Sequence, residues 1–272
     1  MPFPRSRALV MALLAALLAG ALWWSGGMFG QVEDGQVDVA SEEAGKPQLG
    51  LFATLPIYWG EVADVNEMLS GAAGTHWVRT ALESDYRLVP LDTLDGDRGL
   101  AEMDRAILAQ PRALSGAENV ELDAWVRDGG RLLMFADPYL SAESRFHIGD
   151  RRRPQDVVLI SPILARWGLE LLFDEDQPDG VRTVSLGEAT IPVSLAGHFV
   201  KRAPAGGEPS DCALLADGLV ADCAIGAGRA LIVADATLIE NGEKEGGRTA
   251  GLDVLVERAF ESSRGKTGKS RE

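Results

Sequence analysis

The chain has 272 residues, with 26 Lys+Arg against 41 Asp+Glu, and 46% of its residues are hydrophobic. This composition is globular and excludes a disordered or fibrous chain. The net charge of −15 argues against a nucleic-acid-binding protein, which needs a basic surface to meet phosphates. Residues 1–30 carry +2 and residues 263–272 carry +3, so the segment 31–262 carries −20.

The N-terminal segment predicts the compartment. Arg5 and Arg7 precede the uncharged residues 8–24, and Trp23 and Trp24 stand at the end of that segment. At about 1.5 Å per residue, a helix over this segment is about 26 Å long, close to a hydrocarbon core of about 30 Å. Arginines on the short side predict that the N-terminus stays in the cytoplasm. The expectation is one pass through a bacterial inner membrane, with the body in the periplasm.

A cleaved signal peptide is the competing interpretation, because Ala19-Gly20-Ala21 fits a small-x-small cleavage site. A buried helix of a soluble protein is a third. Both leading interpretations place the residues from about 31 onward outside the cytoplasm.

The two cysteines agree with export. Cys212 and Cys223 flank a segment whose centre, Asp217-Gly218, is a favoured pair for a two-residue hairpin turn. With that turn, Cys212 falls directly opposite Cys223, at a Cα separation of about 5.5 Å if the pair is hydrogen-bonded. A disulfide spans that distance. The alternative is two unpaired core cysteines.

The whole chain divides into four segments by composition. Residues 1–30 form the anchor or signal peptide, 31–47 an acidic linker, 48–262 a periplasmic domain and 263–272 a basic tail. Continuous apolar runs of strand length indicate strands covered on both faces, as in a parallel sheet. These runs are 48–55, 105–110, 131–136 and 229–234, with 86–91 as a further candidate.

Helical patterns lie between these runs. Ser115 and Glu118 form a capping-box pattern, and Gly129-Gly130 ends that helix. Shorter helical patterns occur at 161–168 and 252–259. Alternating strands and helices predict an α/β fold with an open, mostly parallel sheet. Residues 169–228 break the alternation, and the strand-like segments 181–186 and 190–195, with the cysteine hairpin, suggest an antiparallel extension.

Ligands of open α/β sheets bind beyond the carboxyl ends of the strands, so the polar residues there are the candidate site. They are Thr54, Tyr58, Glu61, Asp137, Asp235, Thr237, Glu240 and Asn241. Asp137 and Asp235 each end an apolar run and are expected to meet in one crevice. The alternative is that each aspartate caps a following helix or turn.

Other chemistry has little support. The chain has no G-x-S-x-G elbow, no cysteine on a strand-to-helix turn, and no histidine or cysteine spacing typical of zinc. A dinucleotide fingerprint is also absent. No cofactor and no metal are expected. The arginine-rich loop 143–156 is either a grip for an acidic partner or a solvated loop that pairs with Asp150 and Asp156.

The segment 110–138 resembles the auxiliary components of ABC transport systems of the gliding-motility, GldG-like kind. The matching pattern comprises Pro111, Leu114, Ser115, Leu122, Asp123, Trp125, Gly129, Gly130, Asp137 and Pro138. The resemblance implies an extracytoplasmic domain of the flavodoxin or class I amidotransferase type and, as partners, ABC transporter membrane subunits. Members are often longer and carry a second membrane helix, and the amidotransferase nucleophile has no counterpart here.

These observations predict a membrane-anchored, non-enzymatic accessory or binding subunit of an ABC-type transport or envelope system. A periplasmic hydrolase or carbohydrate-active enzyme using Asp137 and Asp235 is the alternative. A two-lobed solute receptor is a third hypothesis.

Overall fold

The computed structural model describes residues 45–61, 74–206, 210–240 and 246–260. Residues from Lys46 onward form one compact unit, separate from Met1–Gly45. Within the described residues, no helix is long and apolar enough to cross a membrane. The expected membrane segment, 8–24, and the basic tail, 263–272, lie outside the described residues.

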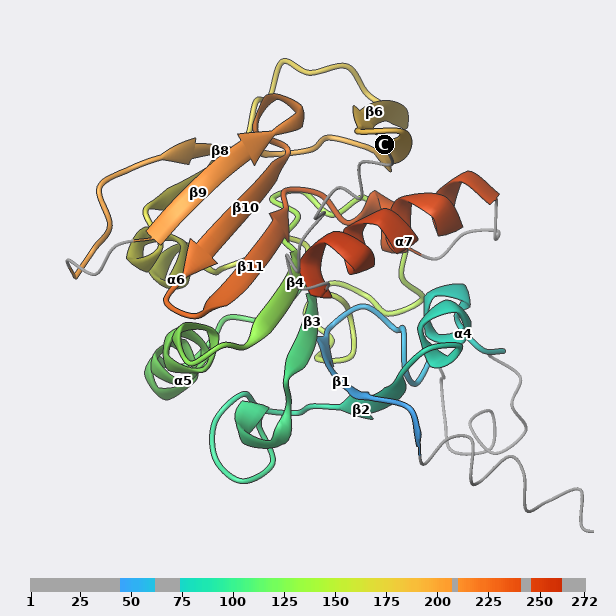
Figure 1. The fold of residues 1–272 in the computed structure, drawn as a ribbon. Helices are drawn as coiled ribbons and strands as arrows, with labels where there is room; N and C mark the ends of the chain where they lie inside the picture. The colour runs from blue at the N-terminus through green and yellow to red at the C-terminus, as the bar shows by residue number, and fades with distance from the viewer. Residues whose placement is uncertain (1–44, 62–73, 207–209, 241–245, 261–272) are drawn as a thin grey trace, which may run out of the picture. The chain divides into compact units, whose positions relative to one another are not determined.

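A seven-stranded sheet forms the centre of this unit, in the order β2-β1-β3-β4-β11-β10-β9 (Figure 1). The first five strands in that order are parallel, and β10 runs antiparallel to both of its neighbours, β11 and β9. The strands are β1 Gln48–Ala53, β2 Arg87–Pro90, β3 Arg105–Ala109, β4 Arg131–Phe135, β9 Ser210–Leu215, β10 Val220–Ile225 and β11 Gly228–Val233. The fold is therefore mixed α/β with a mostly parallel central sheet, as predicted.

The apolar runs occupy the middle of this sheet. In β4, residues 132–135 are all buried, and in β11 the same holds for 230–233. A strand covered by helices on both faces has no solvent-facing side, so its sequence does not alternate. That is why the continuous runs identified these strands.

The helices lie on both sides of the sheet. They are α4 Trp77–Glu83, α5 Gly116–Arg127, α6 Ser161–Arg166 and α7 Gly246–Phe260. The chain moves from β1 to β2 in one direction and from β3 to β4 in the other. Right-handed crossovers then place α4 and α5 on opposite faces, and Figure 1 shows this arrangement, with α7 on the side of α4. Short 3₁₀ turns occur at η1 Leu100–Glu102, η2 Ala216–Gly218 and η3 Thr237–Ile239.

Helix α5 begins as its sequence predicts. The Ser115 hydroxyl accepts from the Glu118 backbone N–H at 3.1 Å, and the Glu118 carboxylate accepts from the Ser115 N–H at 2.8 Å. This capping box satisfies two N–H groups that have no partner within the helix. The helix ends before Gly129, whose φ of +119° is a conformation that other residues rarely adopt.

Four strands lie outside the central sheet, in two separate pairs. β5 Leu169–Leu172 pairs with β8 His198–Lys201, and β6 Arg182–Leu186 pairs with β7 Ala189–Val193. The expectation that 181–186 and 190–195 extend the sheet is therefore wrong, and only the cysteine hairpin does so. Strand β7 packs against α7, which buries its apolar side chains, while its backbone pairs with β6.

The cysteine hairpin has the predicted register. Cys212 faces Cys223 across β9 and β10, and the two form a disulfide. Asp217 and Gly218 both have positive φ, as the predicted turn requires. The Cα atoms of Cys212 and Cys223 are 4.0 Å apart, which is shorter than the expected value of about 5.5 Å and closer to the separation in a non-hydrogen-bonded pair.

Strand β2 forms one edge of the central sheet. The N–H groups of Arg87 and Leu91 bond to the carbonyls of Pro47 and Leu51, both at 2.9 Å. Because successive N–H groups point to opposite sides of a strand, the backbone groups of residues 88 and 90 point away from β1. Position 90 is a proline and has no N–H.

Candidate functional site

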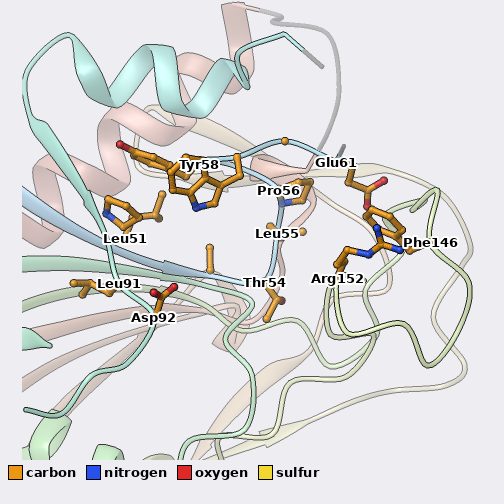
Figure 2. Close-up of a pocket in the computed structure, with 14 residues that line it drawn as sticks. Leu51, Thr54, Leu55, Pro56, Tyr58, Glu61, Leu91, Asp92, Phe146 and Arg152 are labelled. Carbon is orange, nitrogen blue, oxygen red and sulfur yellow. The ribbon is translucent and has the colours of Figure 1, made fainter. Parts of the chain in front are cut away.

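The loops that follow the parallel strands enclose a cavity of about 370 Å³. Its lining comes from the residues after β1, the residues after β2 and the long loop between β4 and α6 (Figure 2). The cavity lies at the carboxyl edge of the sheet, beside β1. At β1 the strand order reverses, because β2 lies on one side of it and β3 and β4 lie on the other. Open α/β sheets bind their ligands at such a place.

The cavity wall is apolar and aromatic. Leu51, Leu55 and Leu91 contribute aliphatic surface, and Tyr58 and Trp59 contribute rings. The centroids of these two rings are 4.7 Å apart at an angle of 69°. Trp59 remains 65% exposed, although its ring is one of the largest apolar side chains of the molecule. An exposed tryptophan beside a cavity is a common feature of binding surfaces.

Arg79 of α4 fixes the position of Tyr58. Its guanidinium lies 4.2 Å from the centroid of the Tyr58 ring and donates a 2.8 Å hydrogen bond to the Tyr58 carbonyl. It also pairs with Glu83 at 2.8 Å. The segment after β1 is thereby attached to the helix that follows it.

Glu61, a predicted ligand-binding residue, does line the cavity, but its carboxylate serves another loop. It accepts hydrogen bonds from the Ser144 hydroxyl at 2.5 Å and the Arg145 N–H at 2.9 Å. Arg145 also donates to the Glu61 carbonyl at 3.1 Å. Glu61 therefore joins two sides of the cavity that lie more than 80 residues apart in the chain.

The arginine-rich loop is held by its own acids. Arg152 makes two bonds to Asp150, at 3.1 and 2.8 Å, and its guanidinium lies 4.1 Å from the Phe146 ring centroid. Arg153 pairs with Asp156 at 2.9 Å. These pairs are the solvated-loop arrangement, in which the positive charge of the loop is largely cancelled locally.

Asp92, at the end of β2, is the other acid of the cavity. Its side chain is exposed, and within the described residues no side chain or N–H group bonds its carboxylate. Its main-chain carbonyl accepts from Arg112 at 3.0 Å, which fixes the position of the residue. Sequence reasoning missed Asp92, because it follows an edge strand that was only a weak candidate.

Gln110 joins the segments that follow β1 and β4 by hydrogen bonds. It is fully buried, has a φ of +48°, and follows β3. Its amide exchanges two hydrogen bonds with the Asp137 backbone, at 2.8 and 3.0 Å, and a third goes to the Gln155 carbonyl at 2.8 Å. Thr54 bonds the Gln110 carbonyl at 2.5 Å and accepts from the Gln155 N–H at 3.1 Å. A buried glutamine before a proline gave no sequence signal of this role.

The two predicted aspartates come together, but beneath the surface. Asp137 is 0% exposed, and its carboxylate accepts N–H groups from Tyr139 at 2.8 Å and Ala236 at 3.1 Å. Asp235 is 1% exposed and accepts from Thr237 at 2.7 Å and Ser194 at 3.0 Å. Neither lines the cavity.

Burial dominates the ionisation of this pair. Desolvation raises the pKa of Asp137 to about 7, against the opposing effect of its backbone hydrogen bonds. Desolvation, together with the nearby charge of Asp137, raises the pKa of Asp235 well above its ordinary value. Glu240, which is 9% exposed, adds further negative charge near Asp137. Two carboxyls this close in an apolar setting favour retention of a proton.

Two predicted site residues remain. Thr237 is buried beside Asp235, at 2% exposure, and Asn241 lies outside the described residues. In the described part of the chain, no group of three or more potential metal ligands forms a metal site.

The comparisons with known proteins found similar folds but no family. No family profile and no curated protein matches the chain. Among solved structures, the mmIFT52 N-terminal domain is 14% identical with a TM-score of 0.50, over 80% of this chain and 99% of that domain.

Two glycosidases are also similar. Exo-beta-1,4-mannosidase Op5Man5 from Opitutaceae bacterium strain TAV5 is 15% identical over 82% of this chain, with a TM-score of 0.43. The GH42 beta-galactosidase Gan42B is 14% identical over 78%, with a TM-score of 0.45. The chain spans 36% and 30% of the length of these two proteins. At these identities the likeness concerns the fold alone.

Proposed function

We propose that this protein is a binding subunit without catalytic activity, anchored in the inner membrane with its body in the periplasm, and accessory to an ABC-type transport system. The observation that carries the binding role is the separation of the accessible cavity from the buried acids. The cavity offers aromatic and apolar surface to solvent, whereas Asp137 and Asp235 are sealed beneath backbone amides.

The same separation weighs against the hydrolase alternative. Catalytic carboxylates of glycosidases face one another across an open cleft, at about 5–9.5 Å, with the substrate between them. An acid with 0–1% exposure has no room for a substrate at its oxygens. Both oxygens of each aspartate also accept main-chain N–H groups, which is how structural aspartates are used.

The transport role rests on the resemblance of the segment 110–138 to GldG-like auxiliary components. The strand order β2-β1-β3-β4 agrees with a flavodoxin-type or class I amidotransferase-type sheet. In such a sheet, the cavity stands where a ligand is expected. The partners proposed are the membrane subunits of the transporter, with the inner membrane contacted through residues 8–24.

Reporter fusions test the membrane topology. A periplasmic reporter fused after Glu272 is expected to be active in intact cells, and the same fusion to a cytoplasmic reporter inactive. The full chain should also remain in the membrane fraction after a carbonate wash, because an uncleaved helix anchors it. Activity of the cytoplasmic reporter would reject the topology. Release of a shortened chain would favour a cleaved signal peptide.

Co-purification tests the transport role. The full chain is co-expressed with an ABC ATPase and permease encoded by neighbouring genes, if the genome carries them there, and the expected result is a stable complex in detergent. Screening the same preparation against amide, ester and glycoside substrates should give no turnover. Turnover lost in both Asp137→Asn and Asp235→Asn would instead support the hydrolase. Absence of such genes, or of a complex, would remove the transporter assignment.

A further inference from the structure

We propose that the cavity beside β1 binds a cationic group, an amine or a guanidinium, between the Asp92 carboxylate and the Trp59 ring. This inference rests on the proposed binding role and names the chemistry of the ligand. It is argued from the charges, the rings and the size of the cavity.

The first argument is the charge that remains uncompensated in the cavity. Of the three charged residues in its lining, Glu61 is bonded by Ser144 and Arg145, and Arg152 is paired with Asp150. Asp92 is the third, and among the described residues nothing pairs with its carboxylate. The cavity therefore offers a negative charge, in a body that is already acidic.

Arg112 contacts Asp92, but its guanidinium is paired with another carboxylate. It forms two bonds to the buried Glu118, at 2.9 and 2.7 Å, and its guanidinium lies 4.9 Å from the Phe52 ring centroid. Its contact with Asp92 is to the main-chain carbonyl. Arg112 thus fixes the main chain of Asp92 and, within the described residues, does not pair with its carboxylate, which stays open to a ligand cation.

The second argument is the aromatic surface on the same cavity. Trp59 is the best ring type for attracting a cation, and it is 65% exposed. Its neighbour Tyr58 already holds a cation, the Arg79 guanidinium, at 4.2 Å. The Tyr58–Trp59 edge-to-face pair keeps the tryptophan in place, so its ring is available to a second cation.

The third argument is size. A cavity of about 370 Å³ lies at the small end of the range for ligand sites, about 300–1,000 Å³. It suits a single side chain or a small diamine rather than a folded domain or a long oligomer. The apolar residues Leu51, Leu55 and Leu91 match the methylene stem that carries an amine. A lysine side chain of a partner peptide and a free diamine share this chemistry.

The test is calorimetric titration of the full chain in detergent with three probes: cadaverine, the peptide Gly-Lys-Gly acetylated at its N-terminus and amidated at its C-terminus, and the same blocked peptide acetylated also on the lysine amine, which removes its only cation. The amine probes are expected to bind, with affinity falling as salt increases, and the acetylated peptide to bind at least tenfold more weakly. Tighter binding of the peptide than of cadaverine identifies a protein partner as the source, and the reverse order identifies a free amine. Equal binding of the charged and acetylated peptides, or no binding of either amine, overturns the proposal.

Two variants and a control locate the site. Asp92→Asn should weaken amine binding at least tenfold, and Trp59→Leu about fivefold, because leucine keeps the apolar surface and loses the ring. Asp97→Asn, an exposed acid outside the cavity lining, should bind as wild type does. Circular dichroism checks that each variant is folded. If Asp92→Asn leaves amine binding unchanged, the ligand does not bind at Asp92 and the assignment of the site is wrong.

The outcome is separable from that of the proposed function. If the chain binds amines through Asp92 but forms no complex with transporter subunits, the ligand class stands and the transport role fails. If the complex forms and a neutral probe binds through Trp59 independently of Asp92, the binding role stands and the cationic ligand fails.

Discussion

Asp137 and Asp235 connect the loops after β4 and β11 to each other and to the segment after β7. Each carboxylate accepts one N–H from two residues onward and one from a distant segment, Ala236 for Asp137 and Ser194 for Asp235. The first bond is the local cap that the sequence suggested. The second could not be read from the sequence, because it depends on how the strands are ordered.

This second bond changes what a conservative substitution should do. On local grounds asparagine replaces a capping aspartate with little loss. With both oxygens accepting N–H groups, however, asparagine must turn its own NH₂ toward a donor and leave one of them unsatisfied. Asp137→Asn and Asp235→Asn are each expected to lower the free energy of unfolding by about 1–3 kcal/mol.

Urea unfolding of the full chain in detergent measures this loss, with Asp97→Asn as the control expected within about 0.5 kcal/mol of wild type. Wild-type stability in both Asn variants would mean that the distant N–H groups do not depend on these carboxylates. Unchanged stability with loss of an enzymatic turnover would return the pair to a catalytic role.

At the scale of elements, the segment that carries the family resemblance is explained by packing. Asp123 accepts bonds from Arg127, Arg166 and the Trp167 indole, at 2.8–3.0 Å, and so attaches α5 to α6. The Trp125 indole bonds the Met103 carbonyl at 2.7 Å. A side chain at Gly130 would lie 2.4 Å from the Trp125 ring, so only glycine fits there. These three residues of the motif thus stabilise the fold.

The hairpin of β9 and β10 was predictable in register, because a two-residue turn determines every pair that follows it. Helix α4 was not predictable. It has seven residues, and its N-cap is His76, whose Nδ1 accepts from the Val78 N–H at 3.2 Å. Histidine is not a usual cap, so no start signal was visible. The sequence predicted only part of the cavity lining, because Glu61 and the loop at 144–145 approach each other only in the folded chain.

The disulfide of this hairpin should stabilise it modestly. The bridge closes a short loop, with a sequence separation of 11, so the loss of unfolded-state entropy is worth at most about 3 kcal/mol. The double variant Cys212→Ala/Cys223→Ala should unfold at lower urea by that amount or less, and reduction of the wild type should have a similar effect. In exported protein, thiol labelling after denaturation without reductant should find no free thiol. Two labelled thiols would contradict the bridge.

For the whole molecule, the ionisable groups predict a stability maximum at mildly acidic pH. The raised pKa values of Asp137 and Asp235 mean that the folded state holds protons that the unfolded state releases. The contribution of Asp137 is full below about pH 4 and is lost as the pH rises through about 7. The contribution of Asp235 has the same sign, being present at low pH and lost as the pH rises. Glu118 acts in the opposite sense, since its pairing with Arg112 lowers its pKa to about 2. Its contribution is present above about pH 4.5 and is lost as the pH falls toward 2.

Urea unfolding of the full chain between pH 3 and pH 9 should therefore give the highest stability near pH 4–6. From Asp137 alone, the fall toward pH 8 should be on the order of 2–4 kcal/mol, and Asp235 adds to it in the same direction. In the double variant Asp137→Asn/Asp235→Asn that fall should flatten, while the acid limb remains. A wild-type stability that rises steadily from pH 5 to pH 8 would refute the assignment of the pair.

The proline at the end of β2 bears on how the molecule behaves at high concentration. A free sheet edge recruits strands from other copies through its outward N–H and C=O groups, which is the first step of aggregation. On β2 the outward N–H positions are 88 and 90, and Pro90 leaves a single donor, on Leu88. An incoming strand would find a single N–H donor on β2, although the outward carbonyls of Leu88 and Pro90 can still accept. The β2 edge is therefore a weaker template for strand addition than an edge with both donors, which lowers the tendency of copies to associate through it at high concentration.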